Sequence, residues 1–401
     1  MEEPIELEVA LNLLLMANKF QPKTESVALV VALSRIVAKD IFAPINVPEF
    51  NRAAMDGYAV KAVLTVGATV EKPATFNVVD EIHAGGNHGE LFGNDVAIRI
   101  MTGAKIPDGF DAVVKQEDTD FGDKTVNIFT EIKPFTNYGA IGEDVKKDSL
   151  LIPKNTRLTP IHLGMLASVG IFEIPVFSKV KVGIISTGDE LAQMGAPLKN
   201  SEIYNSNQFI LLGLLQQCGA EVKLMKQVGD EPLAIGEAIK SCLSKVDVVM
   251  TTGGVSVGKR DFLHTVMPKM GAKKLFWRVN IQPGTPVLAS VYQEKIILSL
   301  SGNPFAALVN FELLAKPLLS HMMGQGSGYD KKRAKLTTNF LKIPKRRRFL
   351  RGFYEDGHVS LPTAVHASSV LSSMVDCNCL IDIKAGTTGL ACGDEVEVLM
   401  I

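Results

Sequence analysis

Three apolar segments of this chain each run into a polar turn that contains glycine. Apolar runs bounded in this way predict buried strands. Glycine lets backbone N–H groups approach a ligand closely, and such a turn ahead of a helix is typical of a site for phosphate or another oxyanion. Together the strand ends predict one open parallel sheet with a ligand crevice at its carboxyl edge. The segments are residues 180–185, 246–250 and 296–300, followed by turns that contain Gly188, Gly253 with Gly254, and Gly302.

Strand and helix patterns alternate from residue 181 to residue 323. Asn205 is placed to cap a helix, and residues 232–243 form another helical pattern before the strand at 246–250. This alternation predicts βαβ units and a doubly wound α/β domain. Residues 44–140 instead carry short β-branched runs split by Gly, Pro and Asn, which is typical of an all-β module.

We therefore predict a multidomain chain of the α/β plus β class. Its parts are a helical or linker domain (1–43 and 141–178), an inserted β-module (44–140), the α/β domain (179–325) and a C-terminal domain of β-barrel character (326–401). Apolar residues recur at steps of three or four over residues 4–20, which predicts a helix, and we predict a second helix over residues 27–37.

Composition excludes several classes of protein. With 401 residues, 46% of them hydrophobic, the chain can bury the cores of roughly two to four domains. Lys and Arg number 42 and Asp and Glu 43, which argues against nucleic acid as a partner. Five cysteines, an acidic N-terminus and no apolar run of membrane-spanning length predict a cytoplasmic protein with no membrane partner.

Carboxylates recur beside the glycine turns, at Asp189, Glu190, Asp230 and Asp261. Each acid taken alone is better explained as a cap or first-turn residue that interacts with a helix dipole. Taken together, at the strand ends of one sheet, they favour a divalent cation that bridges carboxylates to phosphate, as Mg²⁺ does.

The turns do not match the common nucleotide motifs. The segment 252–260 lacks the G-x-x-x-x-G-K-[ST] pattern of a P-loop and the G-x-G-x-x-G pattern of a dinucleotide site. Asn303 and Pro304 are good residues for starting a helix, and that start can still present N–H groups to an anion. A basic cluster between residues 342 and 351 is mostly expected to be a solvated face, with one or two of its cations reaching an anion.

Many short motifs along the chain resemble the MoeA and gephyrin E-domain family of molybdopterin molybdenumtransferases. The similarity runs through essentially the whole chain and in the right order. The segments that carry it are 47–50, 54–59, 99–104, 111–114, 142–144, 186–191, 252–258, 276–277 and 302–304.

The resemblance implies an elongated chain that forms a homodimer, with sites in clefts between the α/β domain of one subunit and the β-domains of the other. It implies adenylylated molybdopterin and molybdate as substrates, and Mg²⁺-dependent insertion of molybdenum with release of AMP. Candidate partners on the same ground are the molybdopterin adenylyltransferase and the proteins that handle the finished cofactor.

The resemblance also assigns roles to individual residues. It implies Glu190, Asp230 and Asp261 as acids of the α/β domain, with Glu190 and Asp261 as metal ligands, and Asp56 and Thr102 as cleft residues of the β-module. Residues implied to bind the pterin, its phosphate or molybdate are Gly253, Gly254, Ser256, Arg278, Gln282, Ser301, Asn303, Asp144, Arg351 and Ser368.

The chain departs from the family pattern at three positions. Gln282 and Thr285 stand where the family usually has lysine, and Ser301 stands where it usually has proline. The first two changes remove cations from a site whose substrates are anions. A non-catalytic pterin-binding or scaffolding relative, and the adenylyltransferase that makes the intermediate, therefore stay open as alternative functions, although Val255 and Ser256 after the glycines disfavour the latter.

Overall fold

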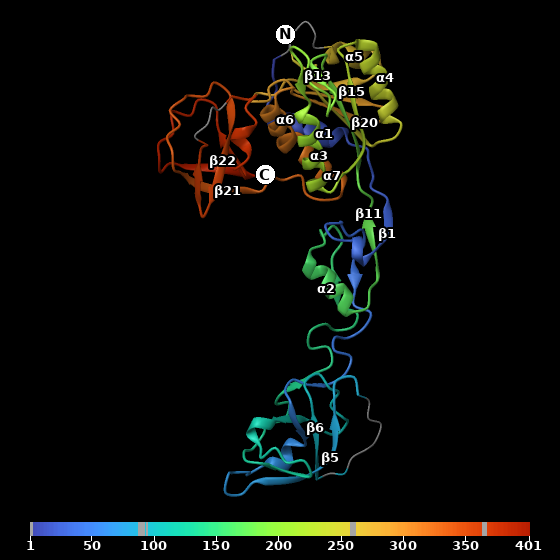
Figure 1. Cartoon of the computed structure of the whole chain (residues 1–401), viewed down its shortest axis with the longest axis vertical. Coiled ribbons are helices and arrows are strands. Elements are labelled where there is room, and N and C mark those ends of the chain that lie inside the picture. The colour runs from blue at the N-terminus through green and yellow to red at the C-terminus, as the bar shows by residue number, and fades with distance from the viewer. Residues whose placement is uncertain (1–2, 87–92, 94, 257–261, 363–366) are drawn as a thin grey trace. The chain divides into compact units, whose positions relative to one another are not determined.

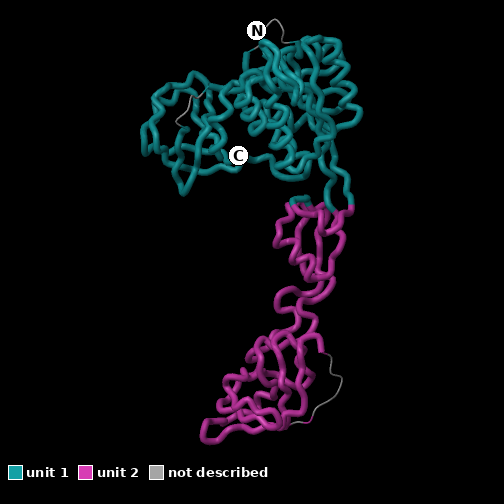
Figure 2. The backbone as a smooth tube through the Cα atoms, in the orientation of Figure 1, with its two compact units in different colours: residues 1–25, 34–36, 176–401 teal, residues 26–33, 37–175 magenta. Residues whose placement is uncertain are grey.

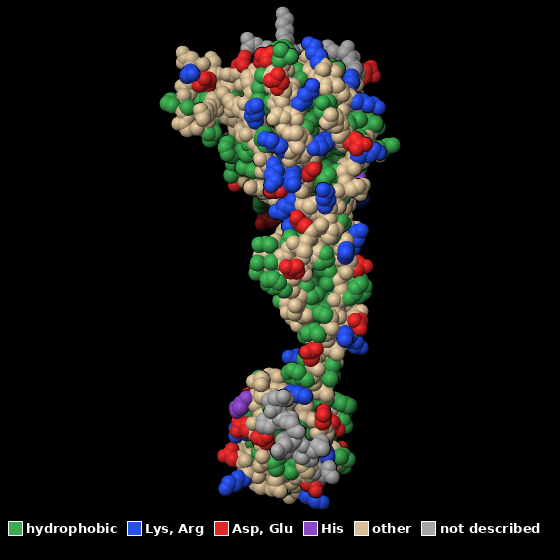
Figure 3. Space-filling view, turned by 90° about the vertical axis from the view of Figure 1, so that its right-hand side faces the viewer, with side chains coloured by type: hydrophobic (Ala, Val, Ile, Leu, Met, Phe, Trp, Pro, Cys, Tyr) green, Lys and Arg blue, Asp and Glu red, His purple; other side chains and the backbone are tan. Residues whose placement is uncertain are grey.

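The computed structural model describes residues 3–86, 93, 95–256, 262–362 and 367–401. Contacts divide the chain into two compact units (Figure 2). Unit 1 contains residues 1–25, 34–36 and 176–401, and unit 2 contains residues 26–33 and 37–175. On the face of the molecule in Figure 3, Lys and Arg lie interspersed with Asp and Glu, in keeping with the net charge of −1.

A six-stranded sheet forms the centre of unit 1. Its strands, in spatial order, are β15 (Glu221–Val228), β12 (Lys181–Thr187), β16 (Val248–Thr252), β20 (Lys295–Leu300), β19 (Leu288–Tyr292) and β17 (Lys273–Trp277). The strands that begin at residues 181, 248 and 295 confirm the three predicted apolar strands.

The three predicted strands run parallel to one another, as expected, but the sheet as a whole is mixed. The first four strands are parallel, but β19 runs antiparallel to both β20 and β17. The β19–β20 hairpin turns at Gln293 and Glu294, which both have positive φ (48° and 65°). Such a turn usually carries Asn-Gly or Asp-Gly, so its sequence signal is missing here.

Helices cover both faces of this sheet, as a doubly wound domain requires (Figure 1). Side chains alternate along each strand, so that Val182 and Ile184 of β12 face one core while Ile185 faces the other. The first core takes in α1 (Leu7–Ala17), α3 (Ser206–Cys218), α6 (Pro304–Asn310), a π-helical turn (Phe311–Ala315) and α7 (Lys316–Met322). The second takes in α4 (Pro232–Leu243) and α5 (Leu263–Lys269).

Local signals explain the helix boundaries around the sheet. The helix α4 has the predicted bounds because Pro232 occupies its first turn and the Glu231 carboxylate accepts the N–H groups of Leu233 and Ala234. Asn205 caps α3 as predicted, and Gly219 ends it in the left-handed conformation (φ 83°). The first predicted helix is also present, as α1.

The C-terminal part of unit 1 is a closed five-stranded β-barrel, as the predicted barrel character requires. The barrel closes because β22 pairs with both β23 and β24. Its strands are β21 (Lys331–Leu336), β22 (Arg347–Glu355), β23 (His358–Ser360), β24 (Cys379–Ile383) and β25 (Glu395–Met400). The short strand β18 (Ile281–Gln282) runs parallel to β22 and joins the α/β part to the barrel.

In its described residues, unit 2 is built from small sheets and one α-helix, α2 (Pro160–Ser168). Its largest sheet has the order β7 (Ala112–Lys115), β4 (Gly57–Val60), β6 (Val96–Ile100), β5 (Ala74–Ile82) and β8 (Thr125–Ile128). Short pairs join β3 (Arg52–Ala53) to β9 (Tyr138–Gly139), and β2 (Ile41–Phe42) to β10 (Leu150–Ile152).

The predicted helix over residues 27–37 was wrong. Its start belongs to β1 (Thr24–Ala28), which pairs with β11 (Glu173–Phe177), and only a 3₁₀ turn follows (Leu29–Val31). Pairing with a strand far away in the sequence overrides the local helical pattern. The remaining short elements are β13 (Leu191–Ala192), β14 (Ile203–Tyr204) and 3₁₀ turns at Ala62–Thr65, Gln116–Asp118 and Ser372–Met374.

Within the part of the chain that the structure describes, no helix combines the length and the apolar character needed to cross a membrane.

Candidate functional site

The order of the parallel strands creates a switch point at the carboxyl edge of the main sheet. From β12 the chain goes outward to β15, and then returns past β12 to β16. The connections that leave β12 and β16 therefore diverge, which opens a crevice beyond the ends of these two strands. Thr187 ends β12 and Thr252 ends β16, and the Thr252 hydroxyl donates to Ser186 Oγ across 3.2 Å.

Gly253 and Gly254 bring the backbone after β16 against the end of β12. Both have positive φ, 88° and 63°. A Cβ on Gly253 would lie 2.4 Å from the carbonyl oxygen of Thr187, and one on Gly254 would lie 3.1 Å from the hydroxyl of the same threonine. The backbone at Gly253 lies too close to the Thr187 carbonyl to leave room for a side chain, so this position requires glycine.

The turn after β20 lies beside this glycine pair. A Cβ on Gly302 would be 3.5 Å from the Cα of Gly253, and the Gly302 carbonyl accepts a 2.6 Å hydrogen bond from Asn207 Nδ2 on α3. Asn303 begins α6 but forms no capping bond with its side chain. Its N–H donates to Ser301 Oγ over 3.4 Å. The predicted meeting of two glycine turns at one sheet edge is thus present.

Acidic side chains line the opposite flank of the crevice. The Asp230 N–H donates to Asp189 Oδ1 across 2.9 Å, which ties the turn after β15 to the turn after β12. The Glu190 carboxylate folds over Gly188, where an added Cβ would lie 2.6 Å from one of its oxygens. A hollow of about 500 Å³ opens here, lined by Gly188, Asp189, Leu191, Gln193, Gln227, Val228 and Gly229.

The donor set at this edge fits a hard cation in part. Mg²⁺ in proteins needs only one or two carboxylates, with substrate phosphate and water completing its shell. Glu190 is exposed and offers such a carboxylate, whereas the second predicted ligand, Asp261, lies outside the described residues. Among the residues described, no group of three or more His, Cys, Asp or Glu side chains gathers to form a complete metal site.

Trp277, the single tryptophan of the chain, holds the glycine loop from behind. Its indole N–H donates to the carbonyl oxygen of Val255 across 3.0 Å, and its ring stacks on His264 at a centroid distance of 5.4 Å. Ser256, a predicted binding residue, follows directly and is half-buried. A buried valine and an indole bond therefore fix the loop just before residue 256.

The other residues predicted on unit 1 lie in two places. Arg278 has a left-handed backbone (φ 73°) that exchanges hydrogen bonds with Val287 and Ile5, and Gln282 is exposed at the end of β18. Arg351 is only 1% exposed, and its guanidinium donates to the carbonyl oxygens of Val370 (2.6 Å) and Ala367 (2.7 Å). Burial lowers the pKa of Arg351.

Arg351 therefore fixes the segment 367–373, and this segment reaches the sheet edge. The carbonyl oxygen of Ser368, also a predicted residue, accepts the N–H of Phe305 in the first turn of α6 across 3.0 Å. The Phe305 ring lies 4.0 Å from the Arg351 guanidinium. Arg351 and Ser368 are thus placed together, next to the helix that follows Asn303.

In unit 2, Asp56 and Thr102 form one hydrogen-bonded pair. Asp56 Oδ1 accepts both the N–H and the hydroxyl of Thr102, each at 2.7 Å. These bonds lower the pKa of Asp56. Gly57 is required in the turn, because a Cβ there would lie 1.8 Å from the carbonyl oxygen of Val114. Asp144 is exposed, and its N–H donates to the carbonyl oxygen of Val47.

Sequence reasoning missed two asparagines that organise the edge, Asn207 and Asn310. Asn310 is completely buried on α6, where its Nδ2 donates to Gly284 O (2.8 Å) and its Oδ1 accepts Ser301 N–H (3.3 Å). A polar residue within the apolar helical run 305–315 is the signal that would have revealed it.

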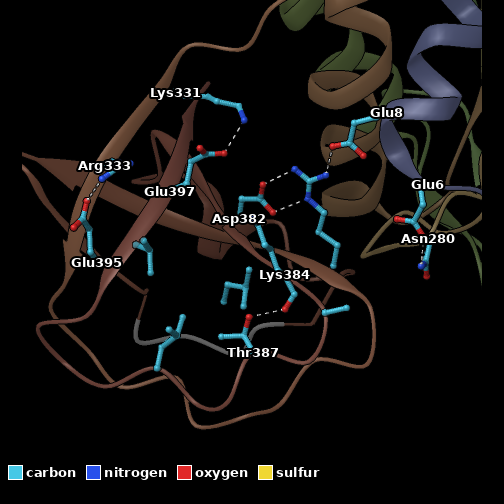
Figure 4. Close-up of a pocket in the computed structure, with 15 residues that line it drawn as sticks. Glu6, Glu8, Asn280, Lys331, Arg333, Asp382, Lys384, Thr387, Glu395 and Glu397 are labelled. Carbon is cyan, nitrogen blue, oxygen red and sulfur yellow. Dashed lines mark hydrogen bonds and ion pairs between the residues drawn. The ribbon is translucent and has the colours of Figure 1, made fainter.

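A larger hollow, of about 810 Å³, lies between the barrel and the segments that carry Glu6, Glu8 and Asn280 (Figure 4). Several of its charges are paired with one another, as in Lys331 with Glu397 (2.8 Å) and Arg333 with Glu395 (3.2 Å). The size of a hollow does not by itself identify a site. We therefore place the candidate site at the sheet edge that carries Gly253, Gly254 and Gly302, where the backbone can approach a ligand closely.

Models of known families match nearly the whole chain. The MoeA N-terminal region (domain I and II) matches residues 5–170, a probable molybdopterin binding domain matches residues 183–321, and the MoeA C-terminal region (domain IV) matches residues 333–401. The chain belongs to the MoeA family.

Relatives of this MoeA-family chain agree over nearly their full length. It is 36% identical to a protein of Haemophilus influenzae named molybdopterin molybdenumtransferase, covering 98% of this chain and 97% of the relative. A Bacillus subtilis protein of the same name is 38% identical, with coverage of 95% and 90%. The crystal structure of the molybdopterin biosynthesis moeA protein from Pyrococcus horikoshii superposes with a TM-score of 0.85, at 30% identity, over the whole of both chains.

Proposed function

We propose that this chain is a molybdopterin molybdenumtransferase of molybdenum cofactor biosynthesis. The observation that carries the proposal is the glycine-lined edge formed by the ends of β12, β16 and β20. This edge lies in a chain whose near full-length relatives bear that enzyme's name. Backbone N–H groups at such an edge suit a substrate phosphate.

The proposed substrates are adenylylated molybdopterin and molybdate, and the proposed products are the molybdenum cofactor and AMP. Gly253, Gly254, Ser256 and Asn303 would hold the phosphate, with Arg278, Gln282 and Ser301 contacting the rest of the ligand; Asp144 of unit 2 is proposed separately as a ligand-binding residue. The Ser368 hydroxyl would donate a hydrogen bond to molybdate. Arg351 would hold in place the segment that carries Ser368. Asp230 would orient the water that attacks the phosphate.

Glu190 and Asp261 are the proposed ligands of Mg²⁺. When bound, this ion would draw negative charge from the phosphate oxygens. Glu190 supports the assignment because its carboxylate lies exposed at the turn after β12. In unit 2, Asp56 would act as a carboxylate that Thr102 keeps ionised, which suits a hydrogen-bond acceptor for the ligand and not a general acid.

Substitution of the acids tests this assignment. Glu190→Gln and Asp261→Asn should each lower AMP release and raise the Mg²⁺ concentration that gives half-maximal rate. Glu395→Gln is a control, since Glu395 pairs with Arg333 across 3.2 Å on the C-terminal barrel. Unchanged Mg²⁺ dependence in both acid variants would remove these residues from the metal site.

We also propose that the chain forms a homodimer through an apolar surface on unit 2. The 3₁₀ turn at residues 29–31 packs on α2, and Leu29 N–H donates to Phe172 O. Around this contact Val30, Ile161 and Phe172 are 84%, 80% and 68% exposed. A surface with this many neighbouring exposed apolar side chains favours a protein partner, and a second copy is the partner that the family resemblance implies.

A cytoplasmic location of the protein stays a prediction from its composition.

A further inference from the structure

Four arginines lie close together at the start of β22, and three of them are engaged within the protein. Arg347 donates to both carboxylate oxygens of Asp382, at 2.8 and 2.6 Å, and pairs with Glu8. Arg351 is buried among carbonyl oxygens. Arg348 is half-buried, with its guanidinium 5.4 Å from the ring of Phe340.

Arg346 differs from these three. Within the described part of the chain its side-chain partner is a hydroxyl, Thr285 Oγ1, at 3.2 Å from its Nη1. A guanidinium has five N–H donors, so this bond leaves most of its hydrogen-bonding capacity for a ligand. Arg346 is partly exposed, which lets solvent or a ligand reach it.

The backbone fixes Arg346 next to Thr285. Strand β18 runs parallel to β22, with Ile281 opposite Arg347 and Gln282 opposite Arg348. The Thr285 hydroxyl donates its own proton to the carbonyl oxygen of Ile281, so its lone pairs are turned toward Arg346. The pairing of β18 with β22 and the bond from Thr285 to Ile281 therefore hold Thr285 in position to accept from Arg346.

Thr285 is also joined to the glycine-lined edge. The neighbouring Gly284 accepts from Asn310, and Asn310 accepts from Ser301, which precedes the turn at Gly302. Gly302 in turn lies against Gly253. Arg346 is thus linked through Thr285 and the buried Asn310 to the edge that carries Gly253 and Gly302.

We propose that Arg346 binds a tetrahedral oxyanion at this edge, with Thr285 holding its guanidinium in place. The proposal rests on the proposed function, because the oxyanion would be either the phosphate of the substrate or molybdate. An Arg–Thr pair contributed by two segments would then supply the positive charge that a lysine at position 285 would otherwise carry.

Binding without turnover tests this proposal. Isothermal titration of the full-length protein with sodium molybdate and, separately, with AMP measures the affinity for each oxyanion. Arg346→Gln should weaken binding of at least one probe by about 10- to 150-fold, the range expected for a charge-assisted hydrogen bond. Arg346→Lys should weaken it less. The probe that is affected identifies the source of the oxyanion.

Two further variants keep the test specific. Arg333→Gln removes an arginine whose side chain is exposed and paired with Glu395, and it should leave both affinities unchanged. The double variant Thr285→Lys/Arg346→Gln should recover most of the lost affinity, since it returns a cation to the same place. Arg346→Gln that binds both probes like the wild type would overturn the proposal, and so would a wild type that binds neither.

Because binding is measured without AMP release, the two claims fail separately. A protein that loses oxyanion affinity on Arg346→Gln but releases no AMP in any condition would support the Arg346 site and refute the proposed reaction.

Discussion

Asn310 donates a 2.8 Å hydrogen bond from its side-chain amide to the carbonyl oxygen of Gly284. The same side chain accepts the N–H of Ser301, so one buried residue joins the turn after β18 to the turn after β20. Proline, usual in the family at position 301, has no N–H to donate. The Ser301 departure is therefore accommodated within the fold by Asn310.

Gly284→Ala should destabilise unit 1 strongly. Gly284 has φ 94°, and a Cβ there would lie 2.5 Å from Asn310 Nδ2. Gly393→Ala is the control, since Gly393 has φ 95° but nothing within 4 Å. We expect the control to lose about 1–2 kcal/mol from backbone strain, and Gly284→Ala to lose about 1–3 kcal/mol more from the clash. Equal shifts in urea denaturation would contradict the role given to Asn310.

Gly253→Ala should weaken the activity of the sheet edge while leaving the rest of the fold intact. The added methyl group would meet the carbonyl oxygen of Thr187 at 2.4 Å, so the loop that carries the N–H groups must move. Gly195→Ala matches it in φ (85° against 88°) and meets nothing within 4 Å. AMP release should fall at least tenfold in Gly253→Ala, which is about the effect of losing one hydrogen bond to a charged group. In Gly195→Ala it should stay near the wild-type rate.

Asp56 should titrate below the ordinary range of an aspartate. Its folded-state pKa is lowered by the two bonds from Thr102, so these bonds favour the ionised form. Their stabilising effect is present at neutral pH and is lost as the pH falls through the folded-state pKa of Asp56. Carboxyl NMR should show the pKa of Asp56 rising in Thr102→Val and staying low in Thr102→Ser, and an unchanged value in Thr102→Val would show that the hydroxyl plays no part.

Charge placed on the apolar surface of unit 2 should prevent dimer formation. Val30→Asp and Ile161→Asp each bury a carboxylate if that surface is an interface, which is strongly unfavourable. Light scattering after size exclusion should then change from the mass of two chains to one. Val375→Asp, at another exposed valine, should remain dimeric. A wild type that is monomeric at all concentrations would refute the dimer.

The sequence predicts best those parts of the fold that local chemistry decides. The helix at residues 232–243 has a proline start and a carboxylate cap, and it forms as predicted. The segment 27–37 has apolar residues at helical spacing and follows Ser26, yet its start pairs with β11, which is distant in the sequence. The antiparallel hairpin at Gln293 and Glu294 escapes prediction because neither residue announces a turn with positive φ.

The candidate site divides in the same way. The glycine turns could be predicted because a strand followed by glycine is a local signal. Asn207, Asn310 and the Arg346–Thr285 pair act through contacts with segments far away in the sequence, 61 positions apart for the last pair. Only the folded chain brings those partners together. Asn310 alone has a local signal, as a polar residue within the apolar run 305–315.

The central claim is tested most directly by AMP release from adenylylated molybdopterin, measured with and without molybdate and Mg²⁺. We expect release that needs Mg²⁺, rises with molybdate and falls at least tenfold in Gly253→Ala. Tight binding of the substrate with no release of AMP under any of these conditions would contradict the account and favour a pterin-binding protein without turnover.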